Sequence, residues 1–249
     1  MQTISLANLA VAFLPVLAVV FILYQWSLGV NNAVYALLRM LVQLLLAGYM
    51  LTYIFAAQSS WIVLAVLAVM VLASGQIALN TIKDMRWMLY KKAALSLLVG
   101  GGFPLLVISQ GVLSLKSWYA PQYIVPLGGM AFANAMTSVS LAAERLHAEM
   151  SRGLSYVEAR KTALRTALIP VINSLFAVGL VSLPGMMTGQ ILSGISPPIA
   201  ARYQIMAMCL IFSASGISAA VFLTLVRADF CKRFENTPRS PAVPDGKKH

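Results

Sequence analysis

The chain has 249 residues, of which 60% are hydrophobic and only 10% are charged, and its mean hydropathy is +0.83. Soluble domains have about a quarter of their residues charged, so this composition excludes a water-soluble core and predicts one integral membrane domain. The net charge of +11 points to membrane topology and not to nucleic-acid binding, because Lys and Arg are spread over short loops and a tail.

Seven apolar segments are each long enough to cross a bilayer as a helix, which takes about 20 residues. Helices are required because lipid offers backbone groups no hydrogen-bond partners. Continuous apolar runs without alternation also exclude an outer-membrane barrel. The predicted fold is therefore all-α, a polytopic membrane domain over residues 1–226 with about seven transmembrane helices. The predicted spans are residues 5–24, 33–55, 60–79, 93–113, 124–143, 168–192 and 203–226.

The charged residues predict how this bundle is oriented. All 7 carboxylates and most Lys and Arg residues lie outside the apolar segments, in clusters at residues 80–92, 144–166 and 227–249. Threading seven spans places these three clusters on one side, and cytoplasmic loops collect Lys and Arg. We therefore expect the N-terminus outside and the C-terminus in the cytosol. Residues 227–249 are predicted to form a basic, disordered cytoplasmic tail.

Residues 144–166 predict a helix–turn–helix elbow between the fifth and sixth spans. The fifth helix can continue through Glu149, and Gly153 is a suitable stop because glycine tolerates the left-handed conformation. The run SYVE at residues 155–158 matches a capping box, so a new helix is expected to start near Tyr156. The elbow is either an ordinary capped connection or an element that couples the membrane domain to a soluble ATPase. The candidate coupling residues are Glu149, Gly153, Ser155 and Glu158.

Polar and helix-breaking residues interrupt the fifth and sixth spans. Pro170 and Pro184 are expected to kink the sixth span, since each removes a backbone hydrogen bond. Gly185 and Gly189 form a G-x-x-x-G pair, which permits close helix packing. The polar groups are either packing contacts or the lining of a kinked pathway at a subunit interface. The pathway candidates are Asn134, Thr137, Asn173, Ser182, Pro184, Gly185, Thr188 and Gln190.

Arg39 and a set of sulfur-containing residues are further candidates inside the spans. Arg39 lies about a turn inside the second span and is expected to snorkel to the inner interface, with anion binding or gating as the alternative. Met186, Met187, Met206, Met208 and Cys209 are either core filler or a thioether and thiolate metal site. Hard metal ions prefer carboxylate or imidazole ligands, and the apolar segments contain neither.

Several function classes lack their signatures in this sequence. No G-x-x-x-x-G-K-[ST] motif is present, so the chain does not bind ATP through a P-loop. No span contains a His that could activate a serine for proteolysis, and none contains the carboxylate relay of a proton-driven carrier. We therefore expect a transporter subunit that is not an enzyme and has no cofactor of its own. ATP and Mg²⁺ would be bound by a separate partner.

Four runs of the sequence are long and distinctive: LLRMLVQLLLAGYMLTYIF (37–55), PLGGMAFANAM (126–136), VGLVSLPGMMTGQI (178–191) and RYQIM (202–206). They resemble the FetB-type permeases, which are bacterial membrane subunits of an iron-exporting ABC transporter. The resemblance covers about residues 5–226. It implies a multi-pass protein of the bacterial inner membrane that exports iron or a metal-related solute. It also implies a cytosolic ATP-binding partner, a permease homodimer in a two-plus-two complex, and coupling through the 144–166 elbow.

A different function class remains open from the residues alone. The chain could be a non-transporting membrane sensor or scaffold, with a basic tail and an elbow that bind a cytosolic regulator. Cations at the ends of the spans would contact membrane lipid in either case, and nucleic acid is not an expected partner.

Overall fold

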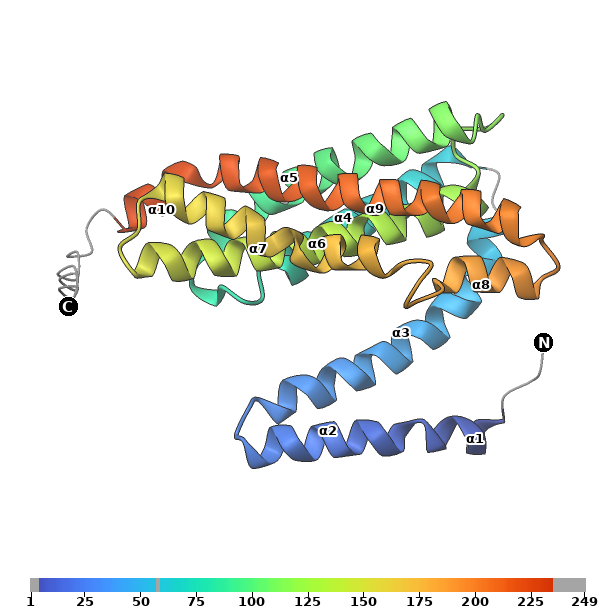
Figure 1. Ribbon diagram of the computed structural model, residues 1–249, viewed down its shortest axis with the longest axis horizontal. Coiled ribbons are helices and arrows are strands. Elements are labelled where there is room, and N and C mark those ends of the chain that lie inside the picture. The colour runs from blue at the N-terminus through green and yellow to red at the C-terminus, as the bar shows by residue number, and fades with distance from the viewer. Residues whose placement is uncertain (1–4, 57–58, 235–249) are drawn as a thin grey trace. The chain divides into compact units, whose positions relative to one another are not determined.

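The computed structural model describes residues 5–56 and 59–234, and its ribbon is drawn in Figure 1. These residues form helices, loops and one isolated bridge between Val178 and Ser182, so the predicted all-α class is confirmed. The chain divides into two compact units, Met1–Gln58 and Ser59–His249. The predicted tail begins with a helix, α10 (Arg227–Phe234), and residues 235–249 lie outside the described residues.

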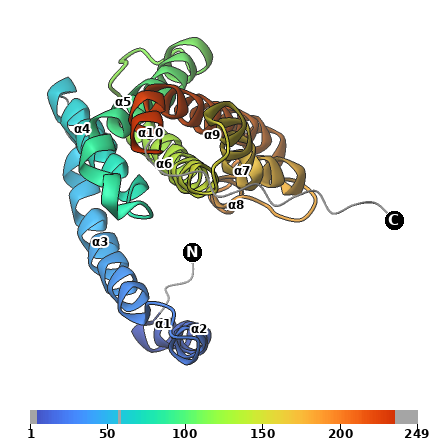
Figure 2. The same ribbon diagram turned by 90° about the vertical axis from the view of Figure 1, so that its left-hand side faces the viewer.

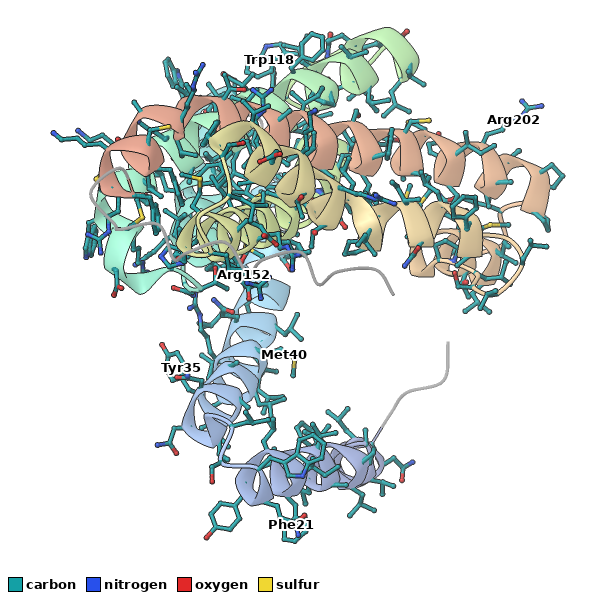
Figure 3. The ribbon with its side chains drawn as sticks, turned by 60° about the vertical axis from the view of Figure 1, so that its left-hand side comes forward. Phe21, Tyr35, Met40, Trp118, Arg152 and Arg202 are labelled. Atoms are coloured by element: carbon teal, nitrogen blue, oxygen red, sulfur yellow. The ribbon has the colours of Figure 1, made fainter. Side chains whose placement is uncertain are left out.

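The first unit contains the two predicted spans nearest the N-terminus. Its helices are α1 (Leu6–Val11), α2 (Phe13–Gln25) and α3 (Val30–Ala56). Side chains such as Phe21, Tyr35 and Met40 project outward from α2 and α3 (Figure 3), and all three are exposed. Helices that are apolar on every face are typical of membrane spans, so this exposure agrees with the predicted contact with lipid.

The second unit is a bundle whose central helices are α5, α6 and α9, which contact one another. Figure 2 looks along several of these helices. Its core is built largely from alanine, leucine and serine, including the fully buried Ala93, Ala135 and Ala214. The elements are α4 (Ser60–Ala78), η1 (Lys83–Met85), α5 (Arg86–Leu106), the π-helical turn η2 (Val107–Val112), α6 (Pro121–Ser151), α7 (Tyr156–Ala177), α8 (Gly185–Leu192), α9 (Pro197–Leu225) and α10.

Glycines of α5 permit the close approach of its neighbours. A Cβ atom built on Gly100 would overlap the backbone N and the Oγ of Ser218 in α9, and one on Gly101 would lie 2.6 Å from the Phe132 ring in α6. Close contact between helix backbones requires small residues at the contact. The glycines of α5 therefore decide how tightly the three central helices pack.

Gly185 and Gly189, whose spacing permits close helix packing, have no helix packed against them within the described part of the chain. A Cβ atom at either position would meet nothing within 4 Å. The reason is that the helix expected to carry both glycines ends before Gly185, so α8 is short and its glycine face has no neighbour in the described part of the second unit.

The sixth predicted span, 168–192, is also corrected by the structure. The helix starts earlier, at Tyr156, ends at Ala177, and resumes only at Gly185. Gly179 has a positive φ of 83°, which ends the helical path. Pro184 has no backbone N–H and disfavours helical geometry at Leu183, so it precedes α8 as its N-cap instead of kinking a continuous helix. Pro170 does remain inside α7.

Six helices of the described residues are long and apolar enough to span a membrane. They correspond to the six other predicted spans, which are thereby confirmed as helices. The α7–α8 segment carries the seventh predicted span, and its crossing of the membrane stays a prediction. Both helices contact α9, and together they run beside it in Figure 1. We call residues 178–184, which separate them, the helix break.

The charged clusters of the second unit gather at one end of the bundle. Lys92 of α5 forms an ion pair with Asp229 of α10. The His147 ring in α6 lies 5.5 Å from the Phe234 ring in α10. Three segments that are far apart in sequence therefore meet at this charged end, as the charge pattern predicts. The side of the membrane that this end faces stays a prediction.

Candidate functional site

The elbow between α6 and α7 has a backbone fixed by local hydrogen bonds. Gly153 has a φ of 86°, its N–H donates to the Met150 carbonyl at 3.0 Å, and the Leu154 N–H donates to the Glu149 carbonyl at 3.2 Å. This pair of bonds is a Schellman motif, the usual way in which glycine ends a helix. The predicted stop at Gly153 is confirmed, and it sets the angle of the turn.

The second half of the elbow starts at the predicted cap. The Ser155 Oγ accepts a hydrogen bond from the Glu158 N–H at 3.4 Å and donates to Glu158 Oε2 at 2.8 Å. Capping of this kind satisfies a backbone donor that would otherwise be free at the helix start. Ser155 and Glu158 are exposed, so both remain accessible to a partner.

Glu149 has a different position from the other candidate coupling residues. Its side chain is 6% exposed and pairs with Arg145 at 2.5 Å and with Arg152 at 3.6 Å. A buried carboxylate needs such partners, because an unpaired buried charge is strongly unfavourable. Glu149 therefore holds the end of α6 and the turn together and does not lie on the elbow's outer surface.

Tyr156 ties the start of α7 to the end of α9. Its hydroxyl donates a hydrogen bond to the Leu223 carbonyl, and the residue is only 8% exposed. Burial of the phenol raises the pKa of Tyr156 from 10.0 to about 12, and the nearby Arg160 acts in the opposite direction. The neutral phenol is thus the form that stabilises the elbow.

Replacing Tyr156 with phenylalanine is expected to remove a pH-dependent part of the stability. Because the pKa is raised on folding, the phenol's contribution is complete below pH 10 and is lost as the pH rises toward 12. Tyr156→Phe should cost about 1 kcal/mol at neutral pH and flatten the fall in unfolding temperature above pH 10. Thermal unfolding in detergent at a series of pH values measures both effects.

A matched control is available at Tyr90, whose hydroxyl donates to the Leu72 carbonyl at 3.2 Å. Tyr90→Phe keeps Tyr156 and should retain the wild-type pH dependence. If the unfolding temperature of Tyr156→Phe fell above pH 10 as steeply as that of the wild type, the stabilising role of the Tyr156 phenol would be contradicted.

The tip of the elbow exposes apolar side chains among charged ones. Leu154 is 37% exposed and Val157 is 51% exposed. Arg152, Glu158 and Arg160, which are close to them in the sequence, are exposed as well. Apolar residues inside a polar rim are typical of a docking surface for another protein. We call Leu154 and Val157, with these three charged residues, the elbow tip.

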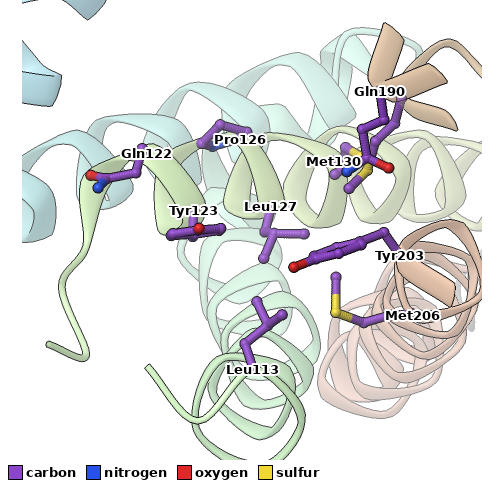
Figure 4. A pocket seen from close by; sticks show the side chains of 10 residues that line it. Leu113, Gln122, Tyr123, Pro126, Leu127, Met130, Gln190, Tyr203 and Met206 are labelled. Atoms are coloured by element: carbon purple, nitrogen blue, oxygen red, sulfur yellow. The ribbon is translucent and has the colours of Figure 1, made fainter. Parts of the chain in front are cut away.

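A cavity of about 350 Å³ lies between α6, α8 and α9. Figure 4 shows Tyr203 of α9 reaching across it toward Leu127 of α6, with Gln190 of α8 above Met130. None of the lining residues is charged. They provide two phenols, two amides and three thioethers, from Tyr123, Tyr203, Gln122, Gln190, Met130, Met186 and Met206.

Gln190 has an unsatisfied group in this cavity. Its Oε1 atom is buried and has no hydrogen-bond partner among the described residues. A buried acceptor without a partner is costly, so a molecule that donates a hydrogen bond would be favoured here. Among the pathway candidates, Gln190 lines this cavity, and its role in a pathway stays a prediction.

The other pathway candidates are more scattered. Asn134 and Thr137 donate back to carbonyls of their own helix, at 2.8 and 3.1 Å, and Thr188 does the same at 3.1 Å. Asn173 is exposed on α7. Pro184, with Ser182, belongs to the helix break, and Gly185 begins α8. These residues therefore do not form one continuous polar lining within the chain.

The predicted soft donors divide between two cavities. Met186 and Met206 line the cavity of Figure 4, whereas Met187, Met208 and Cys209 line a larger hollow beside the helix break. The described residues contain no group of three His, Cys, Asp or Glu side chains that could hold a metal. Arg39 is exposed on α3 in the first unit.

Comparison with known proteins identifies the family. The model of UPF0014, described as an uncharacterised protein family, matches residues 6–231. The chain is a member of UPF0014. A UPF0014 membrane protein of Synechocystis is 36% identical over 241 residues, covering 82% of this chain and 92% of the relative. These matches establish that the chain is a membrane protein of this family.

Two further relatives have informative names. The probable iron export permease protein FetB of Escherichia coli is 29% identical, with 92% of this chain and 93% of the relative covered. The protein ALUMINUM SENSITIVE 3 of Arabidopsis thaliana is 32% identical, with coverages of 84% and 81%. The resemblance to FetB-type permeases is thereby confirmed. No solved structure matches the chain.

Four polar residues of this UPF0014 chain were not predicted as site residues. Gln122, Tyr123 and Tyr203 line the cavity of Figure 4, and Gln204 lines the hollow beside the helix break. Each interrupts an apolar run or begins one, which is a weak signal in the sequence. Their role depends on which helix they face, and the sequence alone does not predict which helix that is.

Proposed function

We propose that the chain is the permease subunit of an ABC exporter in the bacterial inner membrane, and that a separate cytosolic subunit binds and hydrolyses ATP. The observation that carries the proposal is the elbow, which is capped at both helix ends and exposes Leu154 and Val157 at its tip. The export permease named in Escherichia coli supports the same class. In this proposal the charged end faces the cytosol.

The elbow is suited to transmit movement because it is rigid. Glu149 pairs with Arg145 and Arg152 on the α6 side, and Tyr156 ties the α7 side to α9. Force applied at the elbow tip would therefore move α6, α7 and α9 together. The cavity of Figure 4 lies between α6, α8 and α9, and α8 is separated from α7 by the helix break, so a movement of α6 and α9 relative to α8 would change the shape of the cavity. Two copies of the chain with two ATP-binding subunits would complete the exporter.

The lining of this cavity limits the form in which cargo travels. Hard metal ions prefer carboxylate or imidazole ligands, and the cavity provides amide, phenol and thioether groups instead. We propose that the cargo is iron or a metal-related solute that carries its own ligands. Those ligands would donate hydrogen bonds to Gln190 Oε1, which lacks a partner.

Purification of the tagged, full-length chain from its native membranes tests the class of function. We expect it to retain a protein with a P-loop motif in comparable amount. In proteoliposomes, the complex should hydrolyse ATP faster when ferric citrate is present than with citrate alone. Stimulation by ferric citrate tests the cargo, and retention of the ATPase tests the assembly.

The outcomes separate a permease from a membrane sensor or scaffold. The permease proposal would be overturned if the chain retained no ATP-binding protein and if deletion of its gene left the iron sensitivity of the cells unchanged. That pair of results would favour a scaffold. Retention of an ATPase without stimulation by ferric citrate would overturn only the cargo.

A further inference from the structure

The helix break lies at membrane depth. No charged residue occurs between Arg165 and Arg202, and the break at residues 178–184 falls near the middle of this stretch. From Arg165 to Ala177 the helix rises by about 18 Å, which is more than half of the roughly 30 Å hydrocarbon core. The non-helical segment therefore lies inside the apolar layer.

Open backbone groups exclude lipid as the neighbour of the break. Within the part of the chain that the structure describes, the carbonyls of Gly179, Leu180 and Val181 accept no hydrogen bond, and the Leu183 N–H donates none. Non-helical backbone at membrane depth is tolerated only where protein buries it or where it lines a water-filled cavity. The break must accordingly be covered by protein or water.

The side chains of the break exclude water. Leu180 is 90% exposed, Val181 is 85% exposed and Leu183 is 64% exposed. Phe176, at the end of α7, is 77% exposed. Leaving four large apolar side chains in water would forfeit about 1.5–3 kcal/mol for each. Protein is the covering that satisfies both the backbone and the side chains.

A hollow of about 570 Å³ lies directly beside these projecting side chains. Val178, Gly179 and Leu183 of the break form one wall, and Ile205, Met208 and Phe212 of α9 form the other. Gln204 lines the hollow; it is only 6% exposed, and its Oε1 has no partner among the described residues. When a projection and a hollow lie side by side on one surface, two copies of that surface can face each other. The projection of each copy then enters the hollow of the other.

We propose that the helix break is the contact between two copies of this chain, with Leu180 and Val181 of each copy entering the hollow of the other. The contact brings Gln204 next to the partner's break, where the open Leu183 N–H can donate to Gln204 Oε1. It also gives the uncovered glycine face of α8 a neighbour, because Cβ atoms on Gly185 and Gly189 would meet nothing within 4 Å in one chain. The inference rests on the proposed homodimer and assigns it a face.

A second copy of the break suits the open backbone groups better than a regular helix does. Backbone groups in a regular helix are bonded within that helix, so it offers few hydrogen-bond partners. The break of a second copy has open N–H and carbonyl groups of its own.

Cysteine cross-linking in native membranes tests this contact. Cys209 and Cys231 are the free cysteines. Cys231 is replaced with serine in the full-length chain, and Cys209, which lines the hollow, is kept as the disulfide partner of a cysteine in the break. Val181→Cys or Leu180→Cys is then introduced and oxidised with copper phenanthroline. We expect a reducible homodimer band. Phe103→Cys, at a position on α5 that is 62% exposed, is the matched control and should give at least tenfold less dimer.

Any other result would contradict the proposed contact between two copies. No dimer at positions 180 and 181, or an equal yield from Phe103→Cys, means that the break does not meet a second copy. A cross-linked band that contains another protein identifies a different covering. Retention of the ATPase is measured in the same membranes. If the ATPase is retained but no dimer forms, only the proposed contact is overturned. If the dimer forms but no ATPase is retained, the proposed permease function is overturned.

Discussion

Replacing Gly100 with alanine is expected to destabilise the second unit by about 3 kcal/mol or more, at the upper end of overpacking effects. The added Cβ would overlap the backbone N and the Oγ of Ser218 and lie 2.6 Å from its Cα. A backbone atom cannot turn aside as a flexible side chain can, so α5 and α9 would have to separate. Thermal unfolding of the purified protein, followed by tryptophan fluorescence, measures the loss.

Gly102 provides the matched control two residues along the same helix. Its added Cβ would have Leu98 Cδ1 as its nearest neighbour, at 4.0 Å. Alanine is a better helix former than glycine by about 0.5–1 kcal/mol, so Gly102→Ala should leave the unfolding temperature unchanged or raise it. Equal stability of the two variants would show that α5 and α9 do not pack as closely as the structure has them.

Replacing Val157 with aspartate is expected to lower the retention of the proposed ATP-binding subunit at least tenfold, which corresponds to about 1.4 kcal/mol. Val157 is half exposed at the elbow tip, and burying a carboxylate in an apolar contact is strongly unfavourable. The fold should not suffer, because an acidic residue in the first turn of a helix interacts favourably with the helix dipole. Co-purification with the tagged chain measures the effect.

Thr81→Asp introduces the same charge at the same end of the bundle. Thr81 is exposed and lines a cavity with His147, near the end of α6; no residue of the elbow tip lines this cavity. This variant should retain the partner as the wild type does. Full retention by Val157→Asp, with normal unfolding temperatures in both variants, would contradict docking at the elbow tip.

The local features of the elbow could be predicted because they depend on neighbouring residues. A Schellman turn needs a residue that tolerates positive φ, which Gly153 provides, and a helix start needs a side-chain acceptor, which Ser155 provides. The burial of Glu149 could not be predicted in the same way. It depends on how α6 packs in the bundle, and the sequence around Glu149 resembles any charged helix end.

The helix break is a feature that neighbouring residues alone do not predict. Pro184 and Gly179 are visible in the sequence, but Pro170 is visible too and remains inside α7. One proline in a membrane helix can be accommodated when neighbours satisfy the freed backbone groups. Whether a proline bends or ends a helix therefore depends on residues that are distant in the chain.

By itself, the sequence determined that this is an all-α membrane protein. It also determined where six of the spans lie, where the charged residues cluster along the chain and how the elbow is capped. These properties follow from the length of apolar runs and from contacts within a few residues. Only the tertiary structure decided which glycines admit a neighbouring helix, that the helix of the sixth predicted span is broken, and that the methionines divide between two cavities. Such contacts join residues more than a hundred positions apart, such as Gly100 and Ser218, and they depend on how the helices pack.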